Sequence, residues 1–160
     1  VAPIADGDAD PLLALHGSDL RDDARLAYLS STGVYGDHDG AWVDETAETR
    51  CVDAKSKARV VAEAAFSARG ANVLRLGGIY GRGRSLLDKN RRAPGGGEPG
   101  GGGGKPVNRV LADDVAGFLV ELARRDVRGD VFNVVDDDPA PRGDVSAFAR
   151  DLTGGGGGDD

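Results

Sequence analysis

The chain has 160 residues, a hydrophobic fraction of 39% and a formal net charge of −7, so it can form one domain with a real core. Its acidic balance and scattered basic residues argue against a nucleic-acid partner, and its apolar runs are too short to span a membrane. The single cysteine, Cys51, excludes an internal disulfide and favours a reducing compartment. We therefore expect a soluble intracellular protein, in the cytoplasm or in an organelle stroma.

Hydrophobic periodicity predicts helices and strands in alternation along the chain. In chain order we expect a helix at 11–24, a strand at 25–30, a polar loop at 32–50, a helix at 53–68, a strand at 72–76, a strand-end loop at 77–81, a short helix at 84–92, a strand at 109–111, a helix at 113–125, a strand at 131–135 and a helix at 144–152. This alternation predicts the α/β class, with a parallel sheet and flanking helices.

Two glycine tracts interrupt or follow these elements. We interpret the tract at 94–105 as a disordered loop within one domain spanning 1–153, and 154–160 as a disordered tail. The alternative is a phosphate-cradling loop, which needs a preceding strand, a following helix and usually a Lys-Ser/Thr pair. Lys105-Pro106 follows the first tract instead, and a proline cannot donate a backbone hydrogen bond.

The most informative segment runs from Leu29 to Gly36 and places two serines after a short apolar run. In open parallel sheets, ligands bind at the carboxyl ends of the strands. Ser30 and Ser31 could therefore present hydroxyls to a substrate oxygen, or could simply satisfy a turn. Tyr35 and Tyr80 stand beside glycine turns, where each either lines a pocket or closes the sheet edge as a half-buried aromatic.

Several short motifs follow one another along the chain, at 28–37, 40–45, 58–63, 75–81, 83–85, 109 with 113–116, and 131–141. In this order they resemble the NAD-dependent epimerase/dehydratase family, which belongs to the extended and atypical short-chain dehydrogenase/reductases. The match is narrowest to the nucleoside-diphosphate-sugar-epimerase-like branch of that family. The resemblance implies a Rossmann-like fold, an NAD or NADP cofactor and a small-molecule substrate, often a nucleotide sugar. It is also compatible with a homodimer formed through helices such as 53–68.

The resemblance assigns roles to individual residues. Ser31 matches the family's catalytic hydroxyl, which hydrogen-bonds the reacting substrate oxygen. Ser30 and the segment Gly77, Gly78 and Ile79 would border the cofactor, because small residues permit close approach to the flat nicotinamide.

Two family features are missing from this sequence. The G-x-x-G-x-x-G cofactor loop does not precede the first strand, so we expect a sheet that is incomplete on its N-terminal side and a chain that matches only the C-terminal part of the family. The Tyr-x-x-x-Lys pair is also absent: Lys55 stands at the tyrosine position and Arg59 at the lysine position. We therefore expect Lys55 and Arg59 to complete the catalytic site.

Two arginines are the candidate ligands for the substrate. Arg84 and Arg109 could hold a substrate phosphate by bidentate hydrogen bonds, or form surface ion pairs with nearby aspartates. Family members carry a phosphate-binding arginine two positions before Arg109, where this chain has Val107. No metal site is expected. The leading hypothesis is an NAD(P)-dependent epimerase, dehydratase or reductase; the alternatives are a non-catalytic dinucleotide-binding or sensing protein and an inactive fragment.

Overall fold

The computed structural model describes residues 10–88 and 104–152. The disorder expected for the two glycine tracts therefore falls outside the described residues, except at Gly104 and Lys105. Within those ranges, no helix is both long and apolar enough to cross a lipid bilayer.

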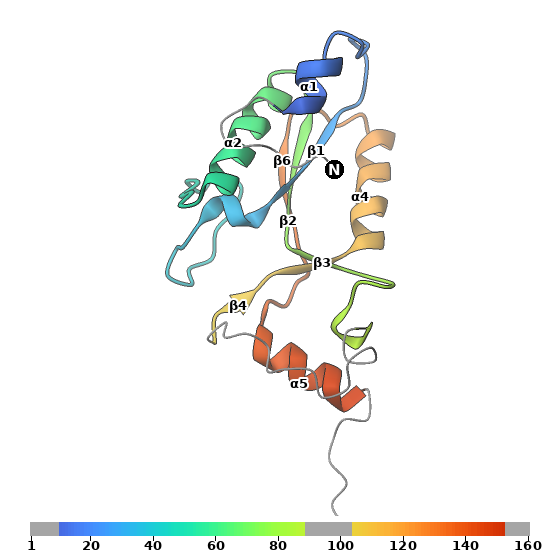
Figure 1. The fold of residues 1–160 in the computed structure, drawn as a ribbon. Helices are drawn as coiled ribbons and strands as arrows, with labels where there is room; N and C mark the ends of the chain where they lie inside the picture. Colours follow the sequence, from blue (N-terminus) through green and yellow to red (C-terminus); the bar gives the residue numbers. More distant parts are fainter. Residues whose placement is uncertain (1–9, 89–103, 153–160) are drawn as a thin grey trace, which may run out of the picture.

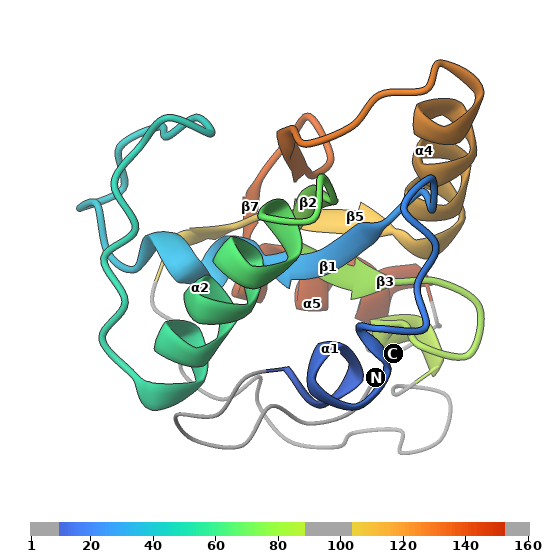
Figure 2. The same cartoon turned by 90° about the horizontal axis from the view of Figure 1, so that it is seen from above.

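A three-stranded parallel sheet forms the centre of the molecule. Its strands are β1 (Ala27–Ser31), β2 (Asn72–Leu76) and β6 (Val131–Val134), in the order β1-β2-β6. The sheet lies between α2 (Ala54–Ser67) and α4 (Ala112–Arg124), as Figures 1 and 2 show from two directions. This arrangement confirms the predicted α/β class with a parallel sheet and flanking helices.

The central strand β2 is buried along its whole length, which explains its apolar sequence. Leu74 and Leu76 pack with Val110, Val115 and Leu122 in the main hydrophobic cluster, to which α4 contributes. The alternate residues of β2 point to the opposite face, toward α2. That face contains Arg75, a residue that is only 8% exposed, and this buried charge is central to the candidate site.

Helix α2 begins where the sequence predicts, because Asp53 caps it. The Asp53 carboxylate accepts hydrogen bonds from the Ser56 backbone N–H at 2.9 Å and from Ser56 Oγ at 2.7 Å. The side-chain hydrogen bond from Ser56, followed by the backbone one, lowers the pKa of Asp53.

Asp53→Ala is expected to lower the melting temperature by a few degrees at pH 7. Because the pKa of Asp53 is lower in the folded protein, the cap stabilises the fold above the ordinary carboxyl pKa. Its contribution should be lost as the pH falls through the lowered pKa. Thermal melts of both proteins at several pH values test this, and a difference that persists unchanged in strong acid would contradict it.

A second region lies beyond the carboxyl ends of the main strands. Here β3 (Gly78–Tyr80) pairs in parallel with β5 (Arg109–Leu111), and β4 (Pro106–Val107) pairs antiparallel with β7 (Ala140–Pro141). Helix α5 (Arg142–Leu152) lies at this end of the molecule (Figure 1). The strand-end loop predicted at 77–81 was wrong, since 78–80 forms a strand whose partner is distant in sequence.

The structure also corrects three predicted bounds. Helix α1 covers only Pro11–His16, because the chain turns at Gly17, where a Cβ would approach the Leu13 carbonyl oxygen to 2.4 Å. The predicted loop at 32–50 begins with a 3-10 helix, η1 (Thr32–Tyr35). Of the short helix predicted at 84–92, residues 86–88 are helical and the part after residue 88 lies outside the described residues.

Candidate functional site

Ser31 ends strand β1 at the carboxyl edge of the parallel sheet. Its Oγ accepts a hydrogen bond from the Gly33 backbone N–H at 3.2 Å and so caps η1. Among the described residues, no protein acceptor takes the hydroxyl hydrogen of Ser31, and the side chain is half-buried. Ser31 therefore holds its oxygen in place while keeping its proton available for a ligand.

The end of β1 adjoins the end of β2. Ser31 is the register partner of Leu76, the residue just before Gly77. Thr32 Oγ1 also donates to the Leu76 carbonyl oxygen at 3.4 Å. The structure thus places Ser31 beside Leu76, the residue that precedes the segment 77–79, at the carboxyl edge where parallel sheets bind ligands.

Ser30 faces the opposite way, into the interior. Its Oγ donates to Glu63 Oε1 at 2.5 Å, and both residues are 6% exposed. The hydroxyl of Ser30 is thus directed at α2, and the geometry does not support its assignment to the cofactor.

Arg75 and Glu63 form a buried ion pair behind this serine. Arg75 Nη2 donates to Glu63 Oε2 at 2.8 Å, and Arg75 Nε lies 3.3 Å from both carboxylate oxygens. Burial alone would lower the pKa of Arg75, but its hydrogen bonds to Glu63 and Tyr35 raise it. Sequence reasoning gave no role to either residue, although a charged residue inside an apolar strand signals a buried partner of opposite charge.

Tyr35 and Glu45 extend this network. The Tyr35 hydroxyl accepts from Arg75 Nη1 at 3.0 Å and donates to Asn133 Oδ1 at 2.8 Å, and the residue is 3% exposed. The Asn133 backbone N–H donates to the Glu45 carboxylate at 2.6 Å, and Arg75 Nη1 lies 3.5 Å from the Glu45 carbonyl oxygen. Tyr35 is therefore buried in the protein interior rather than presented to a substrate, which does not support its substrate-binding assignment.

The segment 77–79 divides into a packed part and an exposed part. A Cβ on Gly77 would lie 2.9 to 3.0 Å from backbone atoms of Asn108 and Arg109, so this glycine permits two backbones to cross. Ile79 packs against the main hydrophobic cluster. Gly78 is exposed, and a Cβ there would meet only ordinary contacts at 3.5 Å or more. Only Gly78 therefore offers an open backbone surface to a ring.

Gly77→Ala is expected to destabilise the fold by about 1–3 kcal/mol, because the added methyl has no room against rigid backbone. Gly78→Ala should change the free energy of unfolding by less than about 0.5 kcal/mol, because its Cβ meets no close contact. Urea denaturation of both variants tests the contrast. Equal stabilities would show that the crossing at Asn108 relaxes.

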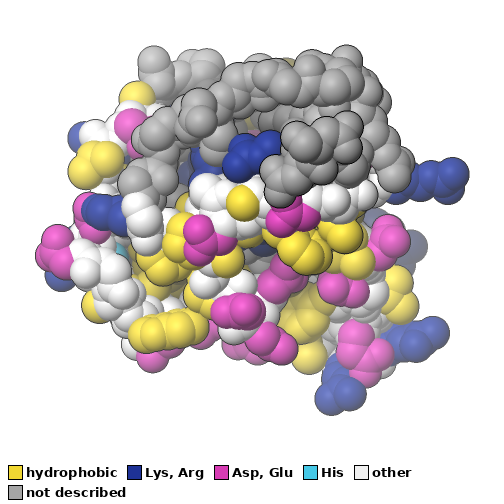
Figure 3. Space-filling view, turned by 90° about the horizontal axis from the view of Figure 1, so that it is seen from below, with side chains coloured by type: hydrophobic (Ala, Val, Ile, Leu, Met, Phe, Trp, Pro, Cys, Tyr) yellow, Lys and Arg dark blue, Asp and Glu magenta, His cyan; other side chains and the backbone are white. Residues whose placement is uncertain are grey.

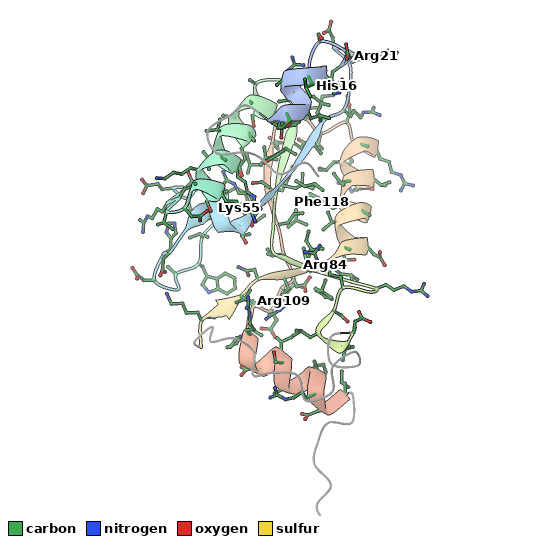
Figure 4. All side chains as sticks on the ribbon, viewed as in Figure 1. His16, Arg21, Lys55, Arg84, Arg109 and Phe118 are labelled. Atoms are coloured by element: carbon green, nitrogen blue, oxygen red, sulfur yellow. The ribbon has the colours of Figure 1, made fainter. Side chains whose placement is uncertain are left out.

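Lys55 and Arg59 lie one helical turn apart near the start of α2. Lys55 is exposed and Arg59 half-buried, and Figure 4 shows Lys55 on the α2 side of the molecule. Because α2 connects the parallel strands β1 and β2, its first turn lies at the same end of the sheet as Ser31. Both cations are thus at the expected end, and among the described residues neither forms a hydrogen bond or ion pair with Ser31.

None of the three tyrosines is placed to replace the family's missing phenol on α2. Tyr28 stacks on Phe66 at 4.9 Å between ring centroids, and burial raises its pKa. A hydrogen bond with Asp136 raises the pKa of Tyr80. Tyr35 is held in the network already described, so acid–base chemistry here would rely on groups other than a tyrosine.

Arg109 and Arg84 occupy the region between the main sheet and α5 (Figure 4). Arg109 Nη1 donates to the carbonyl oxygens of Val107 and Ala140, each at 3.0 Å, and so links β4 to β7. Arg84 is exposed in a turn where its backbone pairs with Gly81. Neither arginine forms an ion pair with a described carboxylate, so the described residues give no support to the surface ion-pair alternative.

Other parts of the described surface offer weaker candidates for a functional site. In the described residues, no group of three or more His, Cys, Asp or Glu side chains could hold a metal ion. A cavity of about 400 Å³ lies at the amino-terminal end of the sheet, where Figure 4 labels Arg21, and Arg69 also lines it. It is remote from Ser31 and at the end of a parallel sheet where ligands do not normally bind. At the opposite end, Figure 3 shows acidic side chains dispersed among hydrophobic ones.

Solved structures resemble this chain, whereas no family profile and no curated protein matches it. Among solved structures, a functionally unknown conserved protein from Silicibacter pomeroyi is 38% identical over 96% of this chain and 55% of its own, with a TM-score of 0.79.

Two further structures carry functional names. A protein from Methylobacillus flagellatus, described as a candidate NAD-dependent epimerase/dehydratase, is 31% identical over 89% of this chain and 51% of its own, with a TM-score of 0.73. MoeE5 in complex with UDP-glucose and NAD is 26% identical over 81% of this chain and 48% of its own, with a TM-score of 0.69. The chain therefore spans about half the length of these structures.

The chain is thus similar to NAD-dependent epimerase/dehydratases in its Rossmann-like sheet, in the order of its motifs and in its sequence, over about half of the length of the matched structures.

Proposed function

We propose that this chain forms the nicotinamide-facing and substrate-facing part of an NAD(P)-dependent epimerase, dehydratase or reductase. Its substrate would be a nucleotide sugar or a related molecule with a reacting hydroxyl or carbonyl. The observation that carries the proposal is the geometry of Ser31, whose oxygen is held by Gly33 while its proton is available at the carboxyl edge of the sheet.

The residues present fit one half of the cofactor. Gly78 is exposed two residues after Leu76, the register partner of Ser31, and a flat nicotinamide ring could approach its backbone. No G-x-x-G-x-x-G loop precedes strand β1, where the family places the loop that binds the pyrophosphate. When bound, the cofactor supplies hydride transfer to or from the substrate carbon.

The chain's own contribution is to handle the substrate oxygen. The Ser31 hydroxyl donates a hydrogen bond to that oxygen and stabilises negative charge that develops on it as the carbon–hydrogen bond changes. Lys55 and Arg59, at the same end of the sheet, provide positive charge that orients an anionic substrate. Arg84, exposed and without an ion-pair partner among the described carboxylates, is the better phosphate ligand of the two arginines, because Arg109 already binds two carbonyl oxygens.

A second function is favoured by the absence of a suitably placed tyrosine. Lys55 is exposed at the position of the family's phenol. Of the two tyrosines nearest to Ser31 along the chain, Tyr28 stacks on Phe66 and Tyr35 is buried in a hydrogen-bond network. A protein that binds the dinucleotide without turning over a substrate would keep the surface that contacts the nicotinamide. It would not need the tyrosine and lysine that the family uses for acid–base chemistry. Turnover by the complete gene product decides between the two functions.

The binding proposal is tested by titrating the chain with the two halves of the cofactor. Reduced nicotinamide mononucleotide should shift the backbone NMR signals of Gly78 and Ser31, whereas adenosine monophosphate should not. Gly78→Leu should abolish the shift at Ser31 by filling the open surface. Gly143→Leu, at a glycine of α5 with equally open surroundings, serves as the matched control. Shifts with adenosine monophosphate alone, or with neither compound, would overturn the proposal.

A further inference from the structure

The sequence contains an ambiguity that its own pattern does not resolve. Ser30 and Ser31 are chemically identical neighbours, and successive side chains of a strand point to opposite faces. A shift of one residue in β1 would exchange the two hydroxyls, so that the other serine would face the ligand edge. Hydrophobic patterning usually prevents such a shift, but it is weak here because Leu29 and Ala27 are both exposed.

A buried acceptor distinguishes the two serines. Ser30 Oγ donates to Glu63 Oε1 at 2.5 Å, and Glu63 is 6% exposed. Glu63 is in turn held by Arg75 of the neighbouring strand through hydrogen bonds of 2.8 to 3.3 Å. A buried carboxylate must keep its hydrogen-bond partners. One hydroxyl of β1 must therefore point to the face of the sheet that packs against α2, where Glu63 lies.

The same ion pair also fixes the segment that follows Ser31. Arg75 Nη1 donates to the Tyr35 hydroxyl at 3.0 Å, and the guanidinium lies 4.8 Å from the centroid of the Tyr35 ring. Tyr35 ends η1, the short helix that Ser31 caps. Ser31 is therefore held from both sides, by Ser30 before it and by η1 after it, and Glu63 and Arg75 are the common anchor.

We infer that Ser30, Glu63 and Arg75 are positioning residues that select Ser31 as the hydroxyl facing the ligand edge. The inference rests on the proposed function for its catalytic meaning, but the orientation of Ser31 is a structural property that can be measured without turnover. A buried ion pair is a weak source of stability compared with apolar packing. Here the ion pair of Glu63 and Arg75 determines which of the two serine side chains, Ser30 or Ser31, faces the ligand edge.

The test uses the Gly33 amide as a reporter, because its N–H donates to Ser31 Oγ. In Ser30→Ala, the backbone NMR signal of Gly33 should move from its wild-type position, as it does in Ser31→Ala. Ser30→Thr keeps the hydroxyl and should leave the Gly33 signal in place. Glu63→Gln, which removes the charge, should move the signal as Ser30→Ala does.

The matched control is Ser56→Ala. Ser56 is 5% exposed, against 6% for Ser30, and its Oγ also donates to a carboxylate, that of Asp53 at 2.7 Å. Loss of this buried hydroxyl should affect stability without moving the Gly33 signal. If Ser30→Ala leaves the Gly33 signal unchanged, or if Ser56→Ala moves it equally, the inference is overturned. Should Glu63→Gln fail to fold, the serine variants alone decide.

A kinetic measurement on the complete gene product adds a second readout. Ser30→Ala should reduce kcat by about tenfold or more with little change in the KM for substrate, since orientation of the donor matters most in the transition state. Ser30→Thr should restore kcat. Absence of turnover in the wild type would refute the catalytic function and leave the NMR result on Ser31 orientation standing.

Discussion

Arg75→Met is expected to lower the free energy of unfolding by about 3–5 kcal/mol, one of the largest effects of any single substitution in this chain. The variant leaves the Glu63 carboxylate buried without its cation, although it still accepts from Ser30. Both members of the pair are at least nine-tenths buried, so water cannot readily replace the lost hydrogen bonds. Urea denaturation followed by circular dichroism measures the change.

The double variant Glu63→Leu with Arg75→Met removes both charges while keeping side chains of similar size. It therefore tests whether the loss of stability comes from an unpaired charge or from lost packing. Because an apolar pair of similar size carries no desolvation cost, the double variant should be more stable than Arg75→Met alone. Ser30 and Tyr35 each lose one hydrogen-bond partner in it, so we do not expect stability above the wild type. A double variant no more stable than Arg75→Met would show that the desolvated charge is not the cause.

Ser31→Ala is expected to reduce turnover by about 10²- to 10⁴-fold in the complete gene product, if the proposed reaction is correct. The hydroxyl is the only group that the structure holds at the sheet edge with its proton available and its oxygen fixed by Gly33, within the residues described. The loss should appear in kcat more than in KM, because the hydrogen bond strengthens as charge develops on the substrate oxygen.

Stability must be measured beside activity, because Ser31 also caps η1. Losing that cap should cost about 1 kcal/mol, too little to unfold a domain of ordinary stability. Ser31→Thr retains the hydroxyl and should recover most of the turnover. If Ser31→Ala keeps wild-type kcat while the wild type is active, Ser31 is not the catalytic hydroxyl.

The sequence predicted well those elements whose signals are local. Helix α2 was expected at 53–68 and covers Ala54–Ser67, because an aspartate cap and a helical apolar stripe act within a few residues of each other. Strand β2 was expected at 72–76 and has those bounds, since a short apolar run between Gly70 and Gly77 has few other solutions. The placement of Ser31 at a strand end follows from the same local pattern.

Contacts between segments that are distant in the sequence account for the features that the sequence predicted wrongly. Gly77 was expected to admit a nicotinamide ring, but it admits the backbone of Asn108, some thirty positions later in the chain. Strands β3, β4 and β7 have only two or three residues each, so they exist because of partners far away in sequence.

The chain's local pattern was thus sufficient for the α/β class and the main helices, and it proposed a candidate site at the end of β1. The motif resemblance gave Ser30 and Ser31 different roles, but only the tertiary structure turned Ser30 into the interior and removed Tyr35 from the substrate side, because both outcomes depend on the buried pair of Glu63 and Arg75. These two residues are twelve positions apart on a helix and a strand. Arg75 in an apolar strand signals a buried acid, but the sequence does not show which acid that is. The effect of a buried charge depends on the residues that surround it, and these residues come together only when the chain folds.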